Sequence, residues 1–530
     1  MPKEFFGREN YLEILSKRIR DLSNGYRQNI AITGDELVGK TSIIFEFLKR
    51  FYDNRIIILY LETRPEALEN FAKRFIGGLL YSFLAPSNIP LKEDLDFLVK
   101  KSEKFAPKTA EKIKLILAAA AKRKTSNIFT DLLSLTDLIH DETGKACVII
   151  FDEFQNLENL SLRNLYREWS KLLLLQKNTM YIILSSLKFK TKNILSKQLS
   201  LLFGNFQLIN VEPFDIKASA NYLEHRLGQE RLNKGLSDFL VHFTGGYPFY
   251  LEVITDALLK SKDRNDLAGL IESLLFETSG ILNQRFSNYF KRFMDLCPNP
   301  EYASMLYLVS SGQNKIKDIA HILRKTKKEI EARIGHLLEL DIISRLGDFL
   351  KINDRVFSFW MKFVYQGKLQ SLTFDARNQK DLFRSSIEGL IKEFLESRER
   401  PVIERISEIL GLFKDDSVQI ERKKIRLEHF KEIKPLEFNT AGLREGIIAR
   451  TKESLWIMTF KDERLSEEDI AGFSRECKKF RNKLERKIII TSQGIDSNAR
   501  LRALEEKILT WDLNNLNQLL DLFSKPRVIV

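Results

Sequence analysis

Short runs of hydrophobic residues alternate with amphipathic stretches along the first 214 residues. Within the amphipathic stretches apolar positions recur at helical spacing, as in residues 40–52, directly after the first run. Strands that alternate with helices predict a parallel, doubly wound sheet. The expected strands are residues 28–34, 55–62, 146–154, 180–187 and 206–214.

The strand pattern stops after Pro213. Residues 215–262 predict helices only, a lid on the sheet, and residues 263–300 predict connecting helices. From residue 301 to 365 the pattern predicts three helices and then two short strands. That order is typical of a winged helix-turn-helix.

The rest of the chain returns to an α/β pattern after two predicted helices, at about 381–397 and 402–412. The fold class is therefore α/β, with a parallel sheet, a helical lid, a winged helix and a C-terminal α/β domain. The expected domains are residues 1–214, 215–300, 301–365 and 366–530. The expected C-terminal strands are residues 446–449, 455–460, 487–491 and 507–511.

Composition supports a folded chain of several domains. It has 530 residues, of which 44% are hydrophobic and 30% charged, with only 24 Gly and 12 Pro. Three widely spaced cysteines give neither a disulfide framework nor a thiolate zinc site, and no segment has the apolar length of a membrane span. We therefore expect a cytoplasmic protein without a membrane partner. The net charge of +13 favours polyanionic partners, although the lysine-rich residues 100–124 are better explained as a solvated helical hairpin.

A glycine-rich loop follows the first predicted strand. Residues 34–41 match G-x-x-x-x-G-K-[ST] between a strand and a helix, the context in which this pattern binds phosphate. Lys40 would reach the β- and γ-phosphates of ATP, and the Thr41 hydroxyl would bind Mg²⁺. The residues expected to line the nucleotide here are Gly34, Asp35, Glu36, Leu37, Val38, Gly39, Lys40, Thr41 and Ser42.

Two acids end the predicted strand at residues 146–154. Asp152 at the carboxyl end of a parallel strand would lie beside the phosphate loop and hold the magnesium shell. Glu153 would be the base that activates water, so Lys40 and Glu153 are the expected catalytic residues. The alternative is that the two acids only make the end of the strand soluble and have no function. The upstream phosphate loop favours the functional interpretation.

These motifs carry a resemblance to a known family. Residues 5–9 (FFGRE), the Walker A loop, residues 152–157 (DEFQNL) and residues 244–251 (TGGYPFYL) together resemble the archaeal ATPase family of STAND P-loop NTPases, which are related to AAA+ proteins. The resemblance covers about the first 365 residues. It implies that Phe6, Gly7, Arg8 and Pro248 flank the adenine, and that Ser185 and Ser186 occupy a sensor position. Simple turn chemistry is an equal explanation for the serine pair.

The chain offers no arginine finger that we can assign. Such a residue can increase the hydrolysis rate ~10³–10⁵-fold and often comes from another subunit. A homo-oligomer or a protein partner that supplies one is therefore an open possibility.

Cations open the third helix of the expected winged domain. Lys325, Lys327, Lys328 and Arg333 suit contacts with the phosphates and major groove of double-stranded DNA. In STAND proteins a winged helix often packs on the ATPase core as a regulatory arm instead. The positive net charge of the chain favours contact with DNA over packing on the ATPase core.

The C-terminal segment loosely resembles a restriction-endonuclease-like domain. An active nuclease of that class needs an acid at one strand end and E-x-K on the next strand. Gly446 and Thr459 stand where the two metal-binding acids belong, and only Lys461 remains. We interpret the domain as degenerate; a shifted alignment that uses Glu445 or Asp462 is the alternative.

The sequence supports three functional hypotheses. The first is a switch that binds and hydrolyses ATP with Mg²⁺ and couples the nucleotide state to DNA binding or assembly. The second is an ATP-regulated nuclease effector, and the third is a scaffold that binds nucleotide without hydrolysis.

Overall fold

The computed structural model describes residues 5–530 except 88–89, 123–126, 161, 200–205, 229–231, 262, 264–265, 366, 368–375, 422, 441 and 481–482. The chain forms two compact units. The first comprises Met1–Pro213 and Glu339–Asp341, and the second comprises Phe214–Leu338 and Ile342–Val530. The predicted boundary near residue 214 coincides with a boundary between these units. The finer division into four domains stays a prediction.

A five-stranded parallel sheet is the centre of the first unit, as the sequence predicts. Its strand order is β2-β3-β4-β1-β5, so β4 separates the strand before the phosphate loop from the strand that ends in Asp152. The strands are β1 (Asn29–Thr33), β2 (Ile56–Glu62), β3 (Ala146–Asp152), β4 (Thr179–Ser185) and β5 (Phe206–Asn210).

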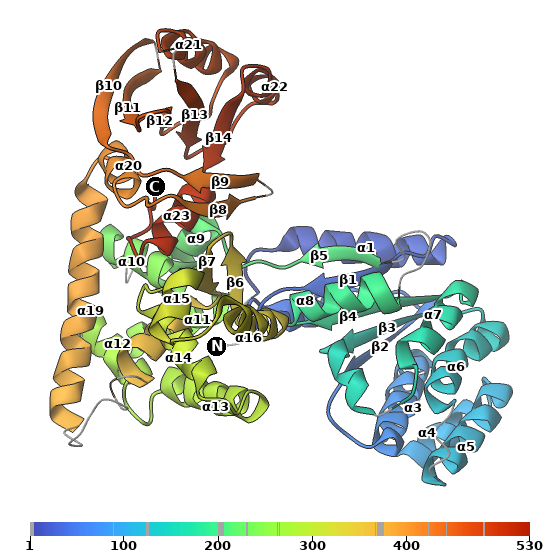
Figure 1. The fold of residues 1–530 in the computed structure, drawn as a ribbon. Helices are drawn as coiled ribbons and strands as arrows, with labels where there is room; N and C mark the ends of the chain where they lie inside the picture. Colours follow the sequence, from blue (N-terminus) through green and yellow to red (C-terminus); the bar gives the residue numbers. More distant parts are fainter. Residues whose placement is uncertain are drawn as a thin grey trace. The chain divides into compact units, whose positions relative to one another are not determined.

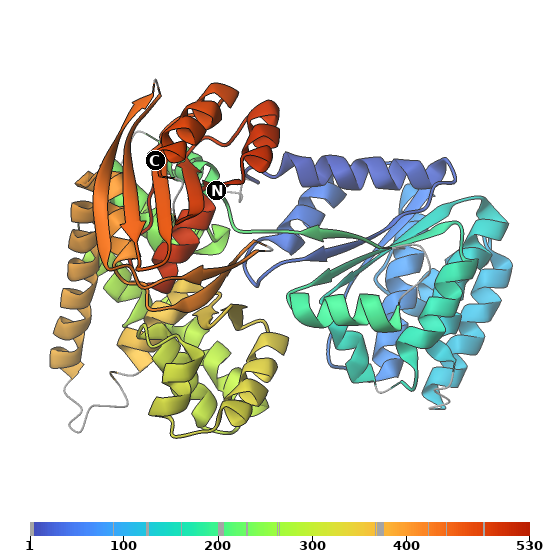
Figure 2. The ribbon, with the colours of Figure 1, turned by 45° about the horizontal axis from the view of Figure 1, so that its top comes forward.

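Burial on both faces explains why these strands have continuous apolar runs. Every residue of β1, β3 and β4 is buried. In β3, Cys147, Ile149 and Phe151 join a core with helices that lie on one side of the sheet, and α1 packs on the other side (Figures 1 and 2). Because consecutive side chains of a strand point to opposite faces, the intervening Val148 and Ile150 serve the second layer.

The helices of the first unit connect these strands. Of the basic stretch 100–124, residues 100–102 end α4 and residues 107–121 form α5, whose Ala110, Ile113 and Ile116 join the same core, while residues 123–124 lie outside the described residues. The helices are α1 (Glu9–Ser23), α2 (Lys40–Arg50), α3 (Leu68–Leu84), α4 (Leu95–Ser102), α5 (Pro107–Ala121), α6 (Ile128–Thr143), α7 (Leu165–Leu175) and α8 (Lys188–Asn193), with short turns η1 (Ala85–Ser87), η2 (Phe154–Leu160) and η3 (Ile194–Gln198).

The second unit begins with helices and then contains the three helices and strand pair expected for residues 301–352. The strands β6 (Ile343–Leu346) and β7 (Phe349–Ile352) are antiparallel. A long helix, α19 (Ala376–Glu399), runs along α10 and α12 (Figure 1). The other helices are α9 (Ile216–Leu227), α10 (Lys234–Thr244), α11 (Pro248–Lys260), α12 (Leu267–Leu275), α13 (Ile281–Leu296), α14 (Glu301–Ser310), α15 (Ile316–Ile322), α16 (Lys327–Glu339) and α17 (Arg355–Trp360), followed by the turn η4 (Met361–Tyr365).

A second five-stranded sheet, in the order β10-β11-β12-β13-β14, follows in the same unit. Strands β10, β11 and β12 pair antiparallel, whereas β12, β13 and β14 pair parallel. One face packs on α21 and α22, and the other packs on α20, α23 and a hairpin of β8 and β9. The elements are α20 (Val402–Leu410), β8 (Asp416–Ile420), β9 (Lys423–Leu427), β10 (Glu432–Thr440), β11 (Leu443–Arg450), β12 (Leu455–Lys461), α21 (Glu467–Lys478), β13 (Leu484–Thr491), α22 (Ser497–Glu505), β14 (Ile508–Asp512) and α23 (Leu513–Leu522).

Sequence reasoning missed β8, β9 and β10. In β9 only Ile425 and Leu427 are buried, and the three charged residues of the strand, Lys423, Lys424 and Arg426, are exposed. A short strand with two buried residues gives a weak apolar pattern. Among the described residues, no helix combines the length and hydrophobicity that crossing a bilayer requires.

Candidate functional site

The phosphate loop joins β1 to α2 in the first unit. Gly39 has φ 90°, a left-handed conformation that suits glycine, and α2 begins at the next residue. Gly34 lies so close to the Val211 carbonyl that a side chain there would clash with it. These two glycines let the loop place the amino end of α2, with its positive dipole, at the centre of the site.

Lys40 is buried and points back into the loop. Its Nζ donates to the carbonyl oxygens of Gly34 and Asp35, both at 2.9 Å. Burial lowers the pKa of Lys40, and the carboxylates of Glu153 and Asp152 partly oppose that effect. The loop therefore holds a buried ammonium group whose hydrogen-bond partners are neutral carbonyls.

The Thr41 hydroxyl meets the Asp152 carboxylate. Thr41 Oγ1 donates to Asp152 Oδ2 at 2.7 Å, which joins the phosphate loop to the end of β3. Tyr60 of β2 donates its hydroxyl to the same oxygen at 2.8 Å. Burial raises the pKa of Asp152, whereas the hydrogen bonds from Thr41 and Tyr60 lower it. A hydroxyl and a carboxylate that converge in this way form an oxygen donor pair that fits Mg²⁺.

The Glu153 carboxylate is held by neighbouring polar groups. Its Oε2 accepts hydrogen bonds from Ser186 Oγ at 2.7 Å and Gln155 Nε2 at 2.5 Å. Glu153 also has φ 50°, a left-handed backbone conformation that is uncommon for a residue with a side chain. The predicted base thus has one fixed orientation in this structure.

The two serines at the end of β4 have different surroundings. Ser185 is fully buried and donates to Gln155 Oε1 at 2.7 Å, whereas Ser186 contacts Glu153 directly. Gln155 therefore bridges Ser185 and Glu153. A sensor role for either serine stays a prediction.

Arg8 lies at the end of the phosphate loop. Its Nη2 donates to the Glu212 carbonyl at 2.7 Å. Its Nη1 lies 3.9 Å from the position that a Cβ atom would occupy at Gly39. Burial lowers the pKa of Arg8 to about 10, against a smaller opposite effect of Tyr11. Phe6 and Gly7 directly precede it. Contact of these three residues with adenine stays a prediction.

The remaining residues of the loop differ in burial. Val38 is fully buried, Ser42 is exposed, and Leu37 has φ 67°. Asp35 forms an ion pair of 2.6 Å with Lys188, which follows the β4 serines. Glu36 is exposed and adds negative charge near Lys40.

Pro248 belongs to the second unit, where it opens α11. The Gly246 carbonyl just before it accepts a hydrogen bond from the Phe214 amide at 2.8 Å. This contact fixes the Gly-x-Pro turn to the start of the second unit. The role of Pro248 in the nucleotide pocket stays a prediction.

Sequence reasoning missed Tyr60, Gln155 and Lys188. Gln155 stands inside the quoted DEFQNL segment and could have been proposed as a partner of its neighbour Glu153. Tyr60 gives no such signal, because its contact depends on the pairing of β2 with β3.

The cations predicted to contact DNA fall into two groups. Lys325 and Arg333 both form ion pairs with Glu301, with an Nζ–Oε1 distance of 2.9 Å for Lys325. Lys327 and Lys328 are exposed in the first turn of α16. Two of the four cations are thus already matched by an acid of α14.

In the C-terminal sheet, β11 and β12 pair so that Gly446 lies opposite Thr459. A side chain at Gly446 would clash with the Phe438 ring, which occupies the place where a carboxylate would stand. Lys461 forms an ion pair of 2.7 Å with Asp469. In the part of the chain that the structure describes, no group of three His, Cys, Asp or Glu side chains could hold a metal ion.

Comparison with known proteins gives a family match over the first part of the chain. Residues 5–254 match the family model of an ATPase domain predominantly from Archaea. This part of the chain is similar to that family, and the match runs from the first unit into the start of the second. The match covers the phosphate loop, both acids of β3, the β4 serines and the Gly-x-Pro turn. No curated protein sequence matches the chain.

Solved structures show distant similarity. A Walker-type ATPase of Pyrococcus abyssi has 18% identity and a TM-score of 0.46, with 67% of this chain and 96% of that chain covered. The Aeropyrum pernix ORC2 protein, in ADPNP–ADP complexes, has 10% identity and a TM-score of 0.39, with coverage of 74% and 95%. The Aeropyrum pernix ORC1 protein in complex with DNA has 13% identity and a TM-score of 0.33, with coverage of 68% and 93%.

Proposed function

We propose that the protein binds ATP with Mg²⁺ at the phosphate loop, hydrolyses it, and uses the nucleotide state as a molecular switch of the STAND type. The observation that carries this proposal is the 2.7 Å contact between the Thr41 hydroxyl and the Asp152 carboxylate. It brings together the two sequence motifs that a P-loop ATPase needs at one point.

Each residue of the site has a chemical role. The loop amides and Lys40 hold the phosphates, and Thr41 and Asp152 would hold Mg²⁺. When bound there, Mg²⁺ would supply positive charge that offsets the negative charge of the phosphates. Glu153 accepts the proton of the attacking water. Its carboxylate directly follows Asp152 at the end of β3, and a carboxylate is a stronger base than the hydroxyl groups nearby.

The arrangement of Lys40 and Glu153 supports a switch. Lys40 donates to two carbonyls of its own loop, and Glu153 accepts from Ser186 and Gln155. Lys40 keeps a third N–H group for a phosphate oxygen, and a bound phosphate would draw the ammonium group away from the loop carbonyls. We therefore expect nucleotide binding to shift the loop and, through the contact between Glu153 and Ser186, the end of β4.

Hydrolysis in this account is slow for the isolated chain. We assign no arginine finger, and a second copy or another protein would supply that cation.

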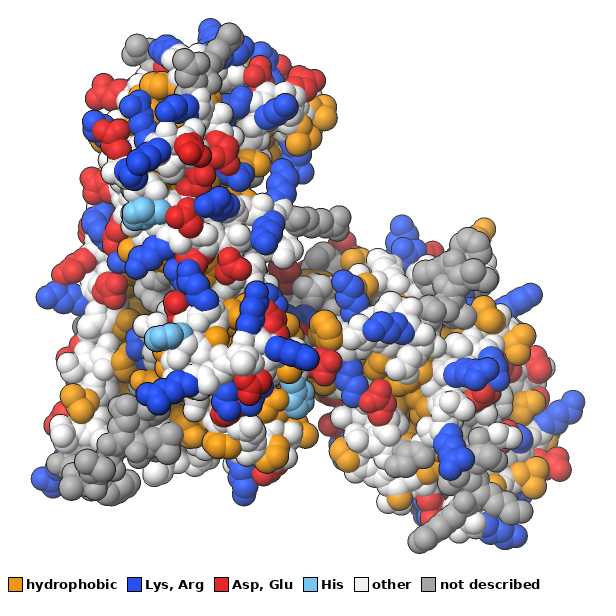
Figure 3. Space-filling model, viewed as in Figure 1, with side chains coloured by type: hydrophobic (Ala, Val, Ile, Leu, Met, Phe, Trp, Pro, Cys, Tyr) orange, Lys and Arg blue, Asp and Glu red, His pale blue; other side chains and the backbone are white. Residues whose placement is uncertain are grey.

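The DNA-binding output is part of the same proposal and rests on the net charge of +13 and on the exposed Lys327 and Lys328. Figure 3 shows Lys and Arg side chains interleaved with Asp and Glu on the face drawn, so charge alone does not mark a DNA surface there.

Nucleotide binding tests the site. Lys40→Ala should lose most of its ATP affinity and remain folded, because the chain loses its cation toward the phosphates and only two hydrogen bonds worth ~1 kcal/mol each. The matched control is Lys49→Ala, an exposed residue on the same helix, α2. Equal affinity of Lys40→Ala and Lys49→Ala for ATP would contradict the assignment.

DNA binding tests the output. Lys327→Glu with Lys328→Glu should weaken binding to double-stranded DNA of any sequence and reduce the log–log salt slope by about one per lost phosphate contact. Lys291→Glu with Lys392→Glu places the same charge change on exposed positions of α13 and α19. Salt slopes that are equal in the two double variants would exclude α16 as the DNA surface.

The nuclease hypothesis is the second candidate, and the C-terminal contacts weigh against it. Phe438 fills the place of the first acid, Thr459 replaces the second, and Lys461 is paired with Asp469. A hydroxyl and a lysine cannot hold the metal charge that phosphodiester hydrolysis needs. We therefore propose that this domain serves in binding. The third hypothesis, a scaffold without hydrolysis, is distinguished by the turnover measurement that closes the Discussion.

A further inference from the structure

A cavity of about 260 Å³ lies within the second unit, far from the phosphate loop in sequence. It opens where helices α10, α14, α17 and α19 meet β7 and the segment after α23. Its wall combines aromatic rings with cationic side chains. The rings are Phe239, Phe243, Phe359 and Phe363, and the charged side chains are Lys351, Arg355, Lys362, Lys525, Glu393 and Asp521.

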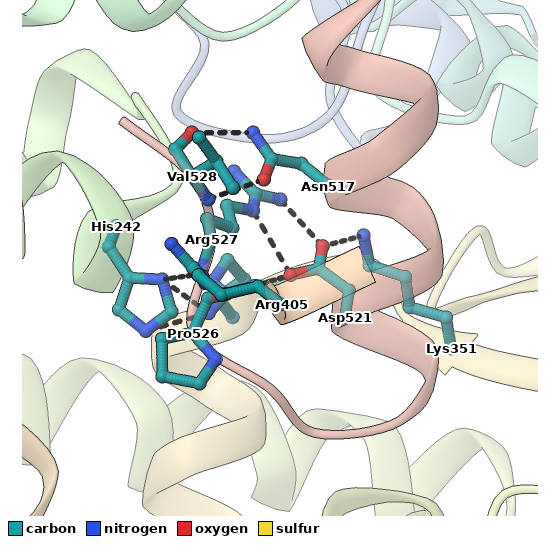
Figure 4. Close-up of polar contacts among 9 residues, drawn as sticks. His242, Lys351, Arg405, Asn517, Asp521, Pro526, Arg527 and Val528 are labelled. Atoms are coloured by element: carbon teal, nitrogen blue, oxygen red, sulfur yellow. Dashed lines mark hydrogen bonds and ion pairs between the residues drawn. The ribbon is translucent and has the colours of Figure 1, made fainter. Parts of the chain in front are cut away.

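One carboxylate that lines this cavity, Asp521, collects three cations, and Figure 4 shows the contacts of Lys351 and Arg527 with it. Asp521 Oδ2 accepts from Lys351 Nζ and Arg527 Nη2, each at 2.7 Å, and Oδ1 accepts from Arg527 Nε at 3.0 Å and from Arg355. Asp521 is only 3% exposed, so its two oxygens are fully used by these donors. Three cations against one carboxylate leave an excess of two positive charges.

The cations keep donors that Asp521 does not use. A lysine ammonium has three N–H groups, and Lys351 uses one of them on Asp521 among the described residues. The side chains of Lys351 and Arg355 stay 26% and 21% exposed, and both line the cavity. Their remaining N–H groups are therefore open to a ligand there.

The cluster has further titratable neighbours among the described residues. His242 accepts the Arg527 amide at Nδ1 and lies beside Arg355, and burial together with that guanidinium lowers its pKa well below the usual value. Arg405, which is buried, adds a further cation and donates to the Pro526 carbonyl. The nearby Glu408 is matched by both Lys525 and Arg400. Glu393, at the rim, is exposed.

We propose that this cavity binds a small dianion, a phosphate group that is either free or carried by a small organic molecule. A dianion matches the excess of two positive charges, and phosphate oxygens suit the guanidinium and ammonium donors. The hydroxyls of Ser358 and Ser524 add further donors on the wall. The cavity is slightly smaller than the ~300 Å³ at which ligand sites usually begin, which limits the organic part to a small group against the rings.

Binding there would join distant parts of the chain. His242 and the rings of α10 come from the predicted lid, Lys351 and Arg355 from the strand pair and α17, and Asp521 from the C-terminal helix. A bound phosphate would thus strengthen the packing of these segments. The proposal does not depend on ATP hydrolysis.

The test measures thermal unfolding of the full chain in sodium phosphate, in sodium phenyl phosphate and in sodium chloride at equal ionic strength. All variants carry Lys40→Ala, which weakens phosphate binding at the phosphate loop. Lys351→Met removes an inner donor, and Lys362→Ser removes an exposed cation at the rim that has no bond to Asp521 and so leaves the cluster intact. Lys392→Met, an exposed residue of α19 outside the cavity, is the control.

The expected result is a saturable rise of the unfolding temperature with phosphate in the control. That rise is lost in Lys351→Met and requires a higher phosphate concentration in Lys362→Ser. Tighter binding of phenyl phosphate would assign the site to a phosphate ester, and equal binding would assign it to free phosphate. Two results would overturn the proposal. One is a rise of the unfolding temperature with the same size and midpoint in all three variants, as general salt stabilisation gives. The other is the absence of a saturable rise in the control.

Discussion

At the residue scale, the nucleotide site consists of short hydrogen bonds between groups that the sequence separates widely. Thr41, Asp152 and Tyr60 come from three different elements. The hydroxyls of Thr41 and Tyr60 both donate to the same carboxylate oxygen of Asp152. The loop residues and Asp152 were predictable, because local spacing alone fixes a phosphate loop and a strand-end acid. Tyr60 was not, because only the register of β2 against β3 brings its hydroxyl to Asp152.

Tyr60 should act as a positioning residue for Asp152. Tyr60→Phe removes the 2.8 Å hydrogen bond, and loss of such a supporting contact typically costs ~10–100-fold in metal affinity or activity. We expect the Mg²⁺ concentration for half-maximal ATP hydrolysis to rise, while the affinity for ATP without Mg²⁺ stays the same.

The control for this experiment is Tyr52→Phe, because Tyr52 is 79% exposed. A magnesium titration that is identical for Tyr60→Phe and Tyr52→Phe would show that the hydroxyl does not position the metal-binding carboxylate. A loss of magnesium-free ATP affinity would show that Tyr60 supports the loop itself.

At the element scale, prediction succeeded where burial is continuous. Strands β1, β3 and β4 are buried along their whole length and gave clear apolar runs, whereas β8, β9 and β10 did not. These three strands form a hairpin and the edge of a sheet, where a strand needs only a few apolar contacts. Helices were predicted more evenly, because α19 and α20 keep a regular apolar face.

Helix α17 has an N-terminal cap that titrates. Asp354 Oδ1 accepts the Phe357 amide at 2.9 Å, Tyr250 donates its hydroxyl to Asp354 Oδ2, and burial raises the pKa of Asp354 to about 6. Because this pKa lies above the ordinary value of 3.8, folding takes up a proton between the two values. The contribution of Asp354 to the free energy of unfolding therefore falls as the pH rises from 3.8 to about 6.

Asp354→Asn should remove this pH dependence and keep the cap, since the amide oxygen still accepts the Phe357 N–H and the amide NH2 group can donate to the Tyr250 hydroxyl oxygen. Urea unfolding at several pH values measures it. The free energy of unfolding should fall less steeply between pH 4 and about 6 in Asp354→Asn than in Asp295→Asn, an exposed control at the end of α13. Parallel curves for the two variants would contradict the buried, titrating cap.

At the scale of the whole molecule, the chain forms two compact units, and the predicted boundary near residue 214 is a boundary between them. The helical lid, the strand pair and the C-terminal sheet pack within one unit, and Asp521 ties β7 and α17 to the C-terminal helix. Long-range ion pairs of this kind leave no periodic signal in the sequence. The packing of these segments against one another could therefore not be predicted. The match to the ATPase family covers residues 5–254, so it includes residues 5–213 of the first unit and the first helices of the second.

The central claim is that Glu153 is the base for ATP hydrolysis at this site. A single-turnover measurement of phosphate release, with ATP binding measured on the same samples, tests it most directly. Glu153→Gln should bind ATP normally and release phosphate at least ~100-fold more slowly, since an amide keeps the shape and cannot accept a proton. Glu158→Gln, at a partly exposed position in the turn that follows, should match the unmodified protein. Equal rates of phosphate release in Glu153→Gln and the unmodified protein would contradict the account.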